Sequence, residues 1–112
     1  MSEKIIEYAN LGIRLILTTG GTGFSVRDVT PEATFEVCER LTPGISEAMR
    51  NYSMQKTKRE MLRRAVSGIR KRNFIVNLPG SPRAVYECLN YILPELQHGI
   101  EILRGDDSNC AK

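Results

Sequence analysis

The stretch from Thr18 to Ala33, TTGGTGFSVRDVTPEA, decides how this sequence is interpreted. The run just before it, Ile13 to Leu17 (IRLIL), is short, apolar and rich in branched side chains, which predicts a buried β-strand. Gly20, Gly21 and Gly23 follow, and glycine lets a backbone take positive φ and come close to a ligand. Successive N–H groups in such a turn form a concave anion site. The stretch therefore predicts a strand that ends in a phosphate-binding turn.

The residues after the turn favour a ligand site over a plain connection between a strand and a helix. Asp28 offers a carboxylate suited to hold Mg²⁺ beside phosphates. Thr30, Pro31 and Glu32 predict the start of a helix, with threonine as N-cap, proline at the first helical position and glutamate at the positive end of the helix dipole. Without these residues, a glycine-rich turn is equally typical of a tight connection that binds nothing.

Two common phosphate motifs are excluded at this turn. The GxxxxGK[ST] motif requires a Gly-Lys pair, and none follows the loop. The GxGxxG motif, counted from Gly21 and Gly23, would require a glycine where Val26 stands. A phosphate site here would belong to neither class.

Further short motifs follow the turn in a fixed order along the chain. They are RDVTPEA, the PG of Pro43–Gly44, the GIR of Gly68–Arg70 and the NLPGSP of Asn77–Pro82. Together with TTGGTG, their order and spacing resemble the molybdenum-cofactor biosynthesis family of the MogA/MoaB type, which includes molybdopterin adenylyltransferase and a domain of gephyrin. The resemblance runs from about Ile5 to Leu103. It implies a three-layer α/β/α molybdopterin-binding fold with a mostly parallel sheet, in residues 1–104, followed by a polar tail in residues 105–112.

Apolar periodicity predicts alternating helices and strands, which argues for parallel strands covered by helices. The predicted strands are Ile13–Leu17, Ala65–Ile69 and Phe74–Leu78. The predicted helices are Glu3–Leu11, Pro31–Leu41, one through Ile45 and Tyr52, Pro82–Leu93, and a last helix that restarts at Pro94 and ends at Leu103. The expected inward stripes are Ala33, Val37, Cys38 and Leu41 in the second helix, and Val85, Cys88, Leu89, Ile92 and Leu93 in the fourth.

The resemblance implies that the chain lacks the N-terminal part of the family domain. In the family, a strand, a helix and a further strand precede the helix that opens this sequence, and that part carries a loop with serine and aspartate and a second functional acid. Without those strands the edge of the Ile13–Leu17 strand would lie open, and so small a sheet is marginally stable alone. We therefore expect weak stability. A misassigned start, a natural truncation and a partner that supplies the rest are all left open.

The resemblance implies that AMP is transferred from ATP to the terminal phosphate of molybdopterin, with Mg²⁺ as cofactor. Asp28 would be the catalytic and metal-binding residue. The turn at 20–23 would bind phosphate, Thr30 and Glu32 would shape the helix start, the turn at 79–81 would line the nucleotide side, and the segment 64–68 would border the pterin. The expected ligand-binding residues are Gly20, Gly21, Thr22, Gly23, Thr30, Glu32, Arg64, Ser67, Gly68, Pro79, Gly80 and Ser81.

The family also forms trimers, so the resemblance implies a homotrimer, with a molybdenum-insertase protein as a possible partner. A different class of function stays open. The chain could be a non-enzymatic module that binds molybdopterin or assembles without turnover, because the second functional acid of the family has no counterpart in this sequence.

Charge is uneven along the chain, whose net charge is +3. Basic residues gather between Lys56 and Arg72 with only Glu60 opposing them. A solvated basic face accounts for the lysines, whereas the resemblance matches Arg64 and Arg70 to arginines near the pterin phosphate. Two substitutions depart from the family pattern: Arg63 replaces a serine, and Arg14 replaces an acid. No aromatic residues alternate with the basic ones, so we do not expect nucleic-acid binding.

Composition points to one small domain in the cytoplasm. No apolar run approaches the ~20 residues of a membrane span, and the N-terminus lacks the order of a signal peptide. Cys38, Cys88 and Cys110 form no CxxC pair, which favours reduced thiols, the first two in the core and the third in the tail. With His98 they are too few for a zinc site, and His98 is expected on the surface.

Overall fold

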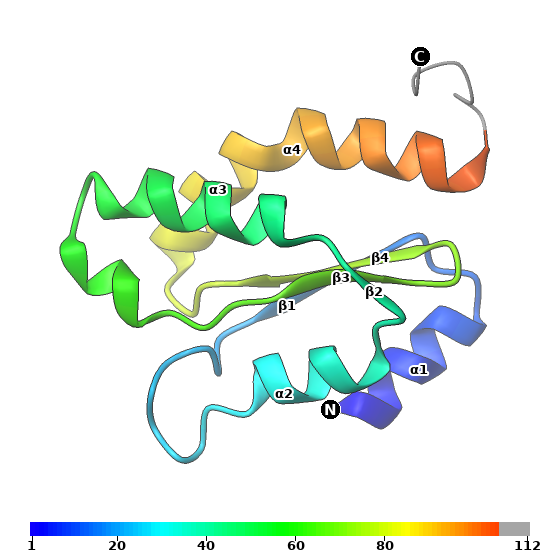
Figure 1. The fold of residues 1–112 in the computed structure, drawn as a ribbon, viewed down its shortest axis with the longest axis horizontal. Helices are drawn as coiled ribbons and strands as arrows, with labels where there is room; N and C mark the ends of the chain where they lie inside the picture. The colour runs from blue at the N-terminus through cyan, green and yellow to red at the C-terminus, as the bar shows by residue number, and fades with distance from the viewer. Residues whose placement is uncertain (106–112) are drawn as a thin grey trace.

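One four-stranded sheet lies between two layers of helices (Figure 1). The structure is a computed structural model that describes residues 1–105. The polar tail, including Cys110, lies almost entirely outside the described residues. In chain order the elements are α1 (Ser2–Asn10), β1 (Leu15–Thr19), α2 (Thr30–Val37), β2 (Arg40–Leu41), α3 (Pro43–Met54), the short 3₁₀ helix η1 (Lys58–Leu62), β3 (Ser67–Arg70), β4 (Asn73–Leu78) and α4 (Pro82–Arg104).

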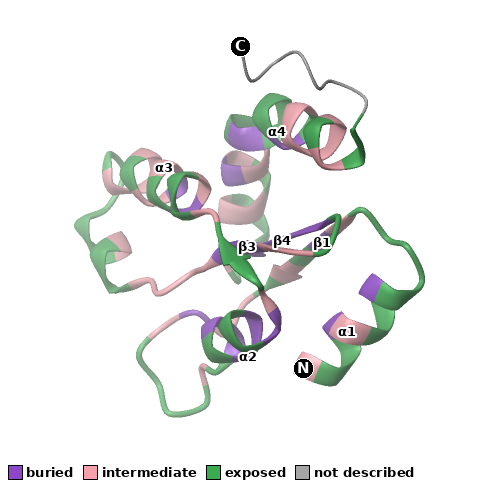
Figure 2. Ribbon diagram, turned by 45° about the vertical axis from the view of Figure 1, so that its right-hand side comes forward, coloured by how far each residue is buried: buried purple, intermediate pink, exposed green. Residues whose placement is uncertain are grey.

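Strand β4 is the centre of the molecule, and all six of its residues are buried. Figure 1 shows α3 and α4 on one face of the sheet and α1 and α2 on the other. Because side chains alternate along a strand, Phe74, Val76 and Leu78 pack with α3 and α4. Ile75 packs on the opposite face, with Ile5 of α1 among its neighbours. The expected three-layer α/β/α arrangement is confirmed, and Figure 2 shows the buried residues gathered where the layers meet.

The sheet has the strand order β1-β4-β3-β2 and mixes parallel with antiparallel pairing. Strand β1 pairs with β4 in parallel, from Leu15 opposite Phe74 to Thr19 opposite Leu78. The other two pairings are antiparallel, so the expectation of a mostly parallel sheet is wrong for them. Strands β3 and β4 are separated by two residues, Lys71 and Arg72, which can close a hairpin but not a parallel crossover.

Several predicted boundaries are wrong, each for a local reason. Strand β1 begins and ends two residues later than predicted, because Thr18 and Thr19 continue the ladder with β4. Helix α2 ends at Val37, where Cys38 turns extended and leads into β2. Leu41 therefore lies in β2 and is exposed rather than on the helix stripe. The two-residue strand β2 and the 3₁₀ helix η1 have no periodic signal and were not predicted.

Helix α4 runs unbroken through Pro94, so the predicted restart there is wrong. A proline inside a helix removes the hydrogen bond to the carbonyl four residues earlier, here that of Asn90. Both residues are exposed, so water can satisfy that carbonyl. Figure 2 shows α4 changing direction part-way along, as a proline kink predicts. Cys88 and Ile92 are buried as expected, whereas Leu93 is largely exposed.

Strand β1 is an edge of the sheet within residues 1–105, as expected. Leu17 is 37% exposed there and Ile13, just before the strand, is 42% exposed. The expected weak stability of the chain stays a prediction. Over the same residues, the structure contains no helix of the length and apolarity that a membrane crossing requires.

Asn77 is a buried polar hub that ties β4 to three neighbours. Its Nδ2 donates to Thr18 Oγ1 and to Thr34 Oγ1, each at 2.8 Å, and its Oδ1 accepts from the Val66 N–H at 3.0 Å. The side chain is fully buried. These bonds connect β4 with β1, with α2 and with the segment that enters β3, so Asn77 sets how the two turns after β1 and β4 lie relative to one another.

We expect Asn77→Ala to lower the free energy of unfolding by about 2–4 kcal/mol. The change removes the hydrogen-bond partner of the Val66 N–H and of two threonine hydroxyls at buried and part-buried positions, where an unsatisfied group costs about 1–3 kcal/mol. Urea denaturation followed by circular dichroism measures the effect. Asn90→Ala on the exposed face of α4 is the matched control and should change stability by less than about 0.5 kcal/mol. Equal effects of the two substitutions would contradict the role of Asn77.

Candidate functional site

Two turns meet at one edge of the sheet because β1 and β4 run parallel. The carboxyl ends of both strands lie there, and such an edge is where open α/β sheets bind ligands. The Gly20 N–H donates to the Leu78 carbonyl at 3.2 Å, which joins the first turn to the end of β4. Gly80 is in backbone contact with Gly20, since a Cβ on Gly80 would lie 3.4 Å from the Gly20 Cα. The sequence-predicted glycine turn and the NLPGSP turn therefore form one surface.

The glycine turn has a conformation that other residues rarely adopt. Gly20 and Gly21 have φ values of +80° and +70°. A Cβ on Gly21 would lie 2.3 Å from Thr30 Oγ1, and the Thr30 N–H donates to the Gly21 carbonyl at 3.1 Å. Thr30 is buried in the first turn of α2, and Val29 occupies the N-cap position instead. The predicted N-cap role of Thr30 is wrong because its side chain packs against the turn.

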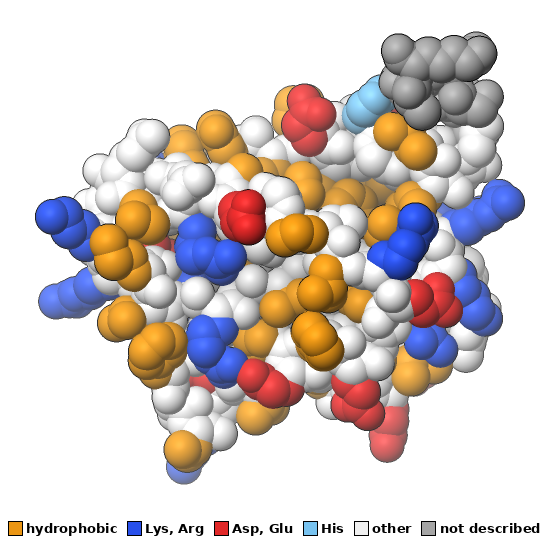
Figure 3. Space-filling model, in the orientation of Figure 1, with side chains coloured by type: hydrophobic (Ala, Val, Ile, Leu, Met, Phe, Trp, Pro, Cys, Tyr) orange, Lys and Arg blue, Asp and Glu red, His pale blue; other side chains and the backbone are white. Residues whose placement is uncertain are grey.

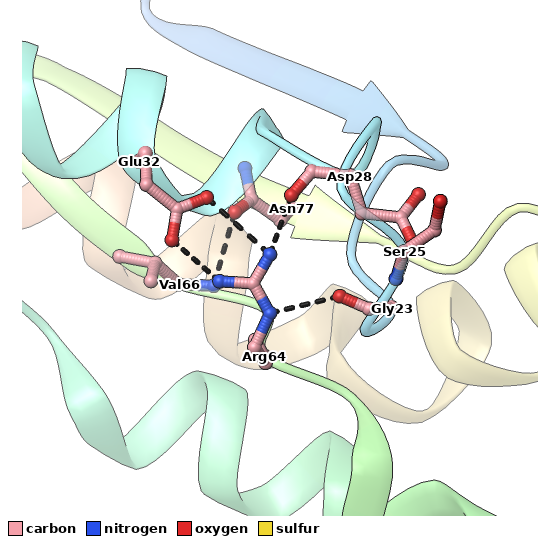
Figure 4. Close-up of polar contacts among 7 residues, drawn as sticks. All are labelled: Gly23, Ser25, Asp28, Glu32, Arg64, Val66 and Asn77. Carbon is pink, nitrogen blue, oxygen red and sulfur yellow. Dashed lines mark hydrogen bonds and ion pairs between the residues drawn. The ribbon is translucent and has the colours of Figure 1, made fainter.

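Asp28 lies in the loop between the glycine turn and α2 (Figure 4). Its Oδ2 accepts from the Ser25 N–H at 2.9 Å, and its own N–H donates to the Ser25 carbonyl at 2.9 Å. Among the described residues, no group of three or more His, Cys, Asp or Glu side chains could hold a metal. One carboxylate fits a Mg²⁺ ion that takes its other ligands from water and substrate phosphates, which is how Mg²⁺ is usually bound.

Arg64 connects this loop to α2 (Figure 4). Its Nε donates to the Gly23 carbonyl at 2.8 Å, and its Nη2 donates to the Asp28 carbonyl. The same guanidinium pairs with both oxygens of Glu32, from Nη1 to Oε2 and from Nη2 to Oε1 at 3.3 Å. The Arg64 N–H also donates to the Thr22 carbonyl at 2.8 Å. The structure thus brings Thr22, Gly23, Asp28, Glu32 and Arg64 together.

The Arg64–Glu32 pair changes the acidity of both groups. The hydrogen bond from Arg64 lowers the pKa of Glu32, and the bond to Glu32 raises the pKa of Arg64. A carboxylate whose pKa is lowered on folding contributes stability at every pH above its ordinary pKa. That contribution is lost as the pH falls through the lowered pKa. The pair is therefore intact at neutral pH, although the exposure of Glu32 keeps its energetic contribution small.

The turn after β4 leads into the N-terminus of α4. Ser81 is the N-cap, and its Oγ accepts from the Ala84 N–H at 3.2 Å. Gly80 and Ser81 are exposed and Pro79 is partly exposed. The N-termini of α2 and α4, whose dipoles favour anions, both follow turns at this edge.

Comparisons with known proteins identify the family of this chain. Residues 1–98 match the model of a family described as a probable molybdopterin binding domain. The chain belongs to this family. It is 41% identical over 92 residues to a molybdopterin adenylyltransferase of Helicobacter pylori, and 44% identical over 105 residues to gephyrin of Dictyostelium discoideum. These matches cover 82% and 94% of the chain respectively.

A solved structure shares the fold. The molybdopterin biosynthesis Mog protein of Mycobacterium ulcerans is 34% identical, with a TM-score of 0.88 over 91% of this chain and 67% of that one. The relatives are longer: the chain spans 52% of the Helicobacter pylori protein and 15% of the gephyrin.

Ser67 and Gly68 lie inside the fold, although the sequence placed them at the pterin. The Ser67 Oγ donates to the Thr42 carbonyl at 2.7 Å and is also 2.8 Å from the Ser46 Oγ. A Cβ on Gly68 would lie 2.5 Å from the Cys38 Sγ, so glycine lets the chain pass closely beside β3. Cys38 itself is half-buried, and burial raises the pKa of its thiol.

Arg64 and Arg70 do not lie together. Arg70 lies at the far end of β3, where its Nη1 donates to the Val37 carbonyl at 3.0 Å, near the end of α2. Strand β3 runs antiparallel to β4 and carries Arg70 away from the turns, so the expected place of both arginines near one pterin phosphate stays a prediction. His98 is partly exposed on α4.

The other basic residues of the 56–72 segment are distributed over several contacts. Lys56 pairs with Glu87 at 2.5 Å, and Arg63, which stands in place of the family serine, pairs with Glu60 at 3.4 Å. Figure 3 shows acidic and apolar side chains among the basic ones on the face that it displays.

Arg50 was not singled out from the sequence, since it sits in a regular helix without a motif. Its Nη1 donates to the Ala65 carbonyl at 3.3 Å, which fixes the segment between Arg64 and β3. With Arg63, Thr22 and Pro79 it borders a cavity of about 20 Å³ under the two turns.

We expect Gly21→Ala to distort the glycine turn and to lower the free energy of unfolding by about 1–3 kcal/mol. Its Cβ would meet Thr30 Oγ1, and its φ is unfavourable for a residue with a side chain. Gly44→Ala is the control, because Gly44 lies in α3 with open space around it and alanine favours helices. Thermal unfolding measures both. A Gly21→Ala protein as stable as Gly44→Ala would contradict the steric argument.

Proposed function

We propose that the edge formed by the turns after β1 and β4 binds ATP and molybdopterin and transfers AMP to the molybdopterin phosphate. The observation that supports the proposal is the backbone contact of Gly20 with Gly80, which brings the two turns together on the side of the sheet where Asp28 lies near Gly23. The names of the relatives support the same activity, since molybdopterin adenylyltransferases are 41–50% identical over the matched segments.

The proposed reaction is a displacement at phosphorus. An oxygen of the terminal phosphate of molybdopterin attacks the α-phosphorus of ATP, the bond from that phosphorus to the bridging oxygen breaks, and pyrophosphate leaves. Such a transfer needs positioning and charge stabilisation more than covalent chemistry from the protein. The N–H groups at 21–23 would cradle phosphates, while the Gly20 N–H holds the turn to the Leu78 carbonyl. The turn at 79–81 would line the nucleotide side.

Asp28 would hold Mg²⁺, which when bound neutralises phosphate charge. Within the described part of the chain, its Oδ1 makes no hydrogen bond, while its Oδ2 is fixed by the Ser25 N–H. The carboxylate is thus oriented by the loop and still offers an oxygen to a cation. A homotrimer, a molybdenum-insertase partner and a cytoplasmic location belong to the proposal on the strength of the resemblance.

We expect Asp28→Asn to weaken ATP binding about tenfold or more in the presence of Mg²⁺, and to leave Mg²⁺-free binding unchanged. An amide keeps the hydrogen bond from Ser25 but loses the charge that a hard cation needs. Isothermal titration of the chain with ATP, with and without Mg²⁺, measures the difference. Glu47→Gln on the exposed face of α3 makes the same charge change and is the control.

Pyrophosphate release from ATP in the presence of molybdopterin tests the transfer itself. Release that depends on molybdopterin and on Asp28 supports the proposal. Binding of both ligands without release would contradict AMP transfer and favour the non-enzymatic binding module. Failure to bind either ligand would overturn the proposed site.

A further inference from the structure

We propose that Arg64 and Glu32 form a latch that fixes the loop 23–28 and, through it, the position of Asp28. In this role Arg64 is a positioning residue. The resemblance had instead placed Arg64 near the pterin phosphate, as a ligand of it. The latch rests on contacts within the chain. Its consequence for metal and nucleotide binding rests on the proposed function.

The donors of Arg64 are almost all in use. A guanidinium has five N–H groups. Four of them are accounted for by the hydrogen bonds to the Gly23 carbonyl, to the Asp28 carbonyl and to the two oxygens of Glu32. A bidentate arginine–phosphate contact requires two parallel N–H groups. Arg64 could make such a contact only by giving up its hold on Glu32 or on the loop.

The contacts of Arg64 lie at the two ends of the loop. Its Nε reaches the carbonyl of Gly23 and its Nη2 that of Asp28, so one rigid planar group sets the separation between the first and last residues of the segment. Its backbone N–H also donates to the Thr22 carbonyl. One residue thus fixes three carbonyls of the segment that carries the carboxylate.

The loop has little else to hold it. Phe24 is 68% exposed and Val26 95%, so the apolar side chains of the loop contribute little packing. Besides those from Arg64, the hydrogen bonds of this loop within residues 1–105 join Ser25 with Asp28 and with Arg27, and these are local. A loop without an apolar anchor is ordered by its polar contacts. The hydrogen bonds of Arg64 connect the loop to the segment between η1 and β3 and, through Glu32, to α2.

Glu32 is the second half of the latch. It lies in the first turn of α2 and engages Arg64 through both carboxylate oxygens, which orients the guanidinium plane toward the loop. Arg64 is two-thirds shielded from solvent and Glu32 is mostly exposed. Removing the carboxylate would release the guanidinium without disturbing the core.

Backbone ¹⁵N order parameters test the latch in the 112-residue chain without any ligand. Arg64→Lys keeps the charge but loses the planar fork, and Glu32→Gln removes the orienting charge. In each we expect the order parameters of Ser25, Val26 and Asp28 to fall from about 0.85 to below about 0.6. The double variant should be no more mobile than either single one, because both changes open the same latch.

Two references accompany this measurement. The Ile75 and Val76 amides of β4 should stay rigid in every variant, which shows that the fold is intact. Arg59→Lys, an exposed arginine of η1, should leave the loop unchanged. Unchanged order parameters at Ser25 and Asp28 in both Arg64→Lys and Glu32→Gln would overturn the latch.

Ligand binding separates a positioning role from a direct phosphate contact. If Arg64 and Glu32 act by positioning Asp28, we expect Glu32→Gln to weaken Mg²⁺-dependent ATP binding several-fold. In the Asp28→Asn background, the same substitution should cause no further loss of ATP affinity. If Arg64 instead contacts the molybdopterin phosphate directly, Glu32→Gln frees its guanidinium and tightens molybdopterin binding. That result would overturn the positioning role. If the unaltered chain binds no ATP, the proposed function fails, while the order parameters still decide whether the latch exists.

Discussion

The parallel pairing of β1 with β4 is the constraint on which the site depends. Because the two strands point the same way, the turns that follow them leave the sheet at one edge, and Gly20 can contact Gly80. A central strand must be covered on both faces, and all six residues of β4 are buried. Its apolar side chains pack toward α3 and α4, and Asn77 is hydrogen-bonded to Thr34 of α2 on the other face. The position of the candidate site is therefore a consequence of how the core is packed, and a change in that core moves both turns.

The parts of the fold that the sequence predicted are those with local causes. Glycines at 20 and 21 are required by positive φ, and the strand at 74–78 is marked by an unbroken run of buried residues. Both signals are contained in a few adjacent residues. The contact of the Asp28 carboxylate with the Ser25 N–H is equally local, while its role as a metal ligand stays a prediction. The family resemblance added the order of the motifs, and the match to the family model confirms it.

The parts that were missed depend on contacts between distant residues. Nothing near Arg64 in the sequence indicates that its side chain reaches the Gly23 carbonyl, 41 residues earlier. The GIR motif predicts a binding role for Gly68. In the structure, the absence of a side chain on Gly68 makes room for the Cys38 side chain beside β3. Pro94 predicts a helix break by its chemistry, but the packing of Ile92 and Leu96 on either side keeps α4 continuous. In each case a contact between residues distant in the sequence, which no local pattern indicates, decides the outcome.

The two halves of the candidate site are held by different physical effects. The glycine turn is fixed by sterics, because Thr30 leaves no room beside Gly21 and the Leu78 carbonyl binds Gly20. The loop that carries Asp28 is fixed by charge-assisted hydrogen bonds from Arg64, at a place where its apolar side chains are exposed. Sterics are insensitive to salt and pH, whereas a partly exposed ion pair is screened by salt and is lost when its carboxylate is protonated. The lowered pKa of Glu32 keeps that carboxylate ionised to a lower pH than an ordinary glutamate, so protonation breaks the pair with Arg64 only in more acidic solution.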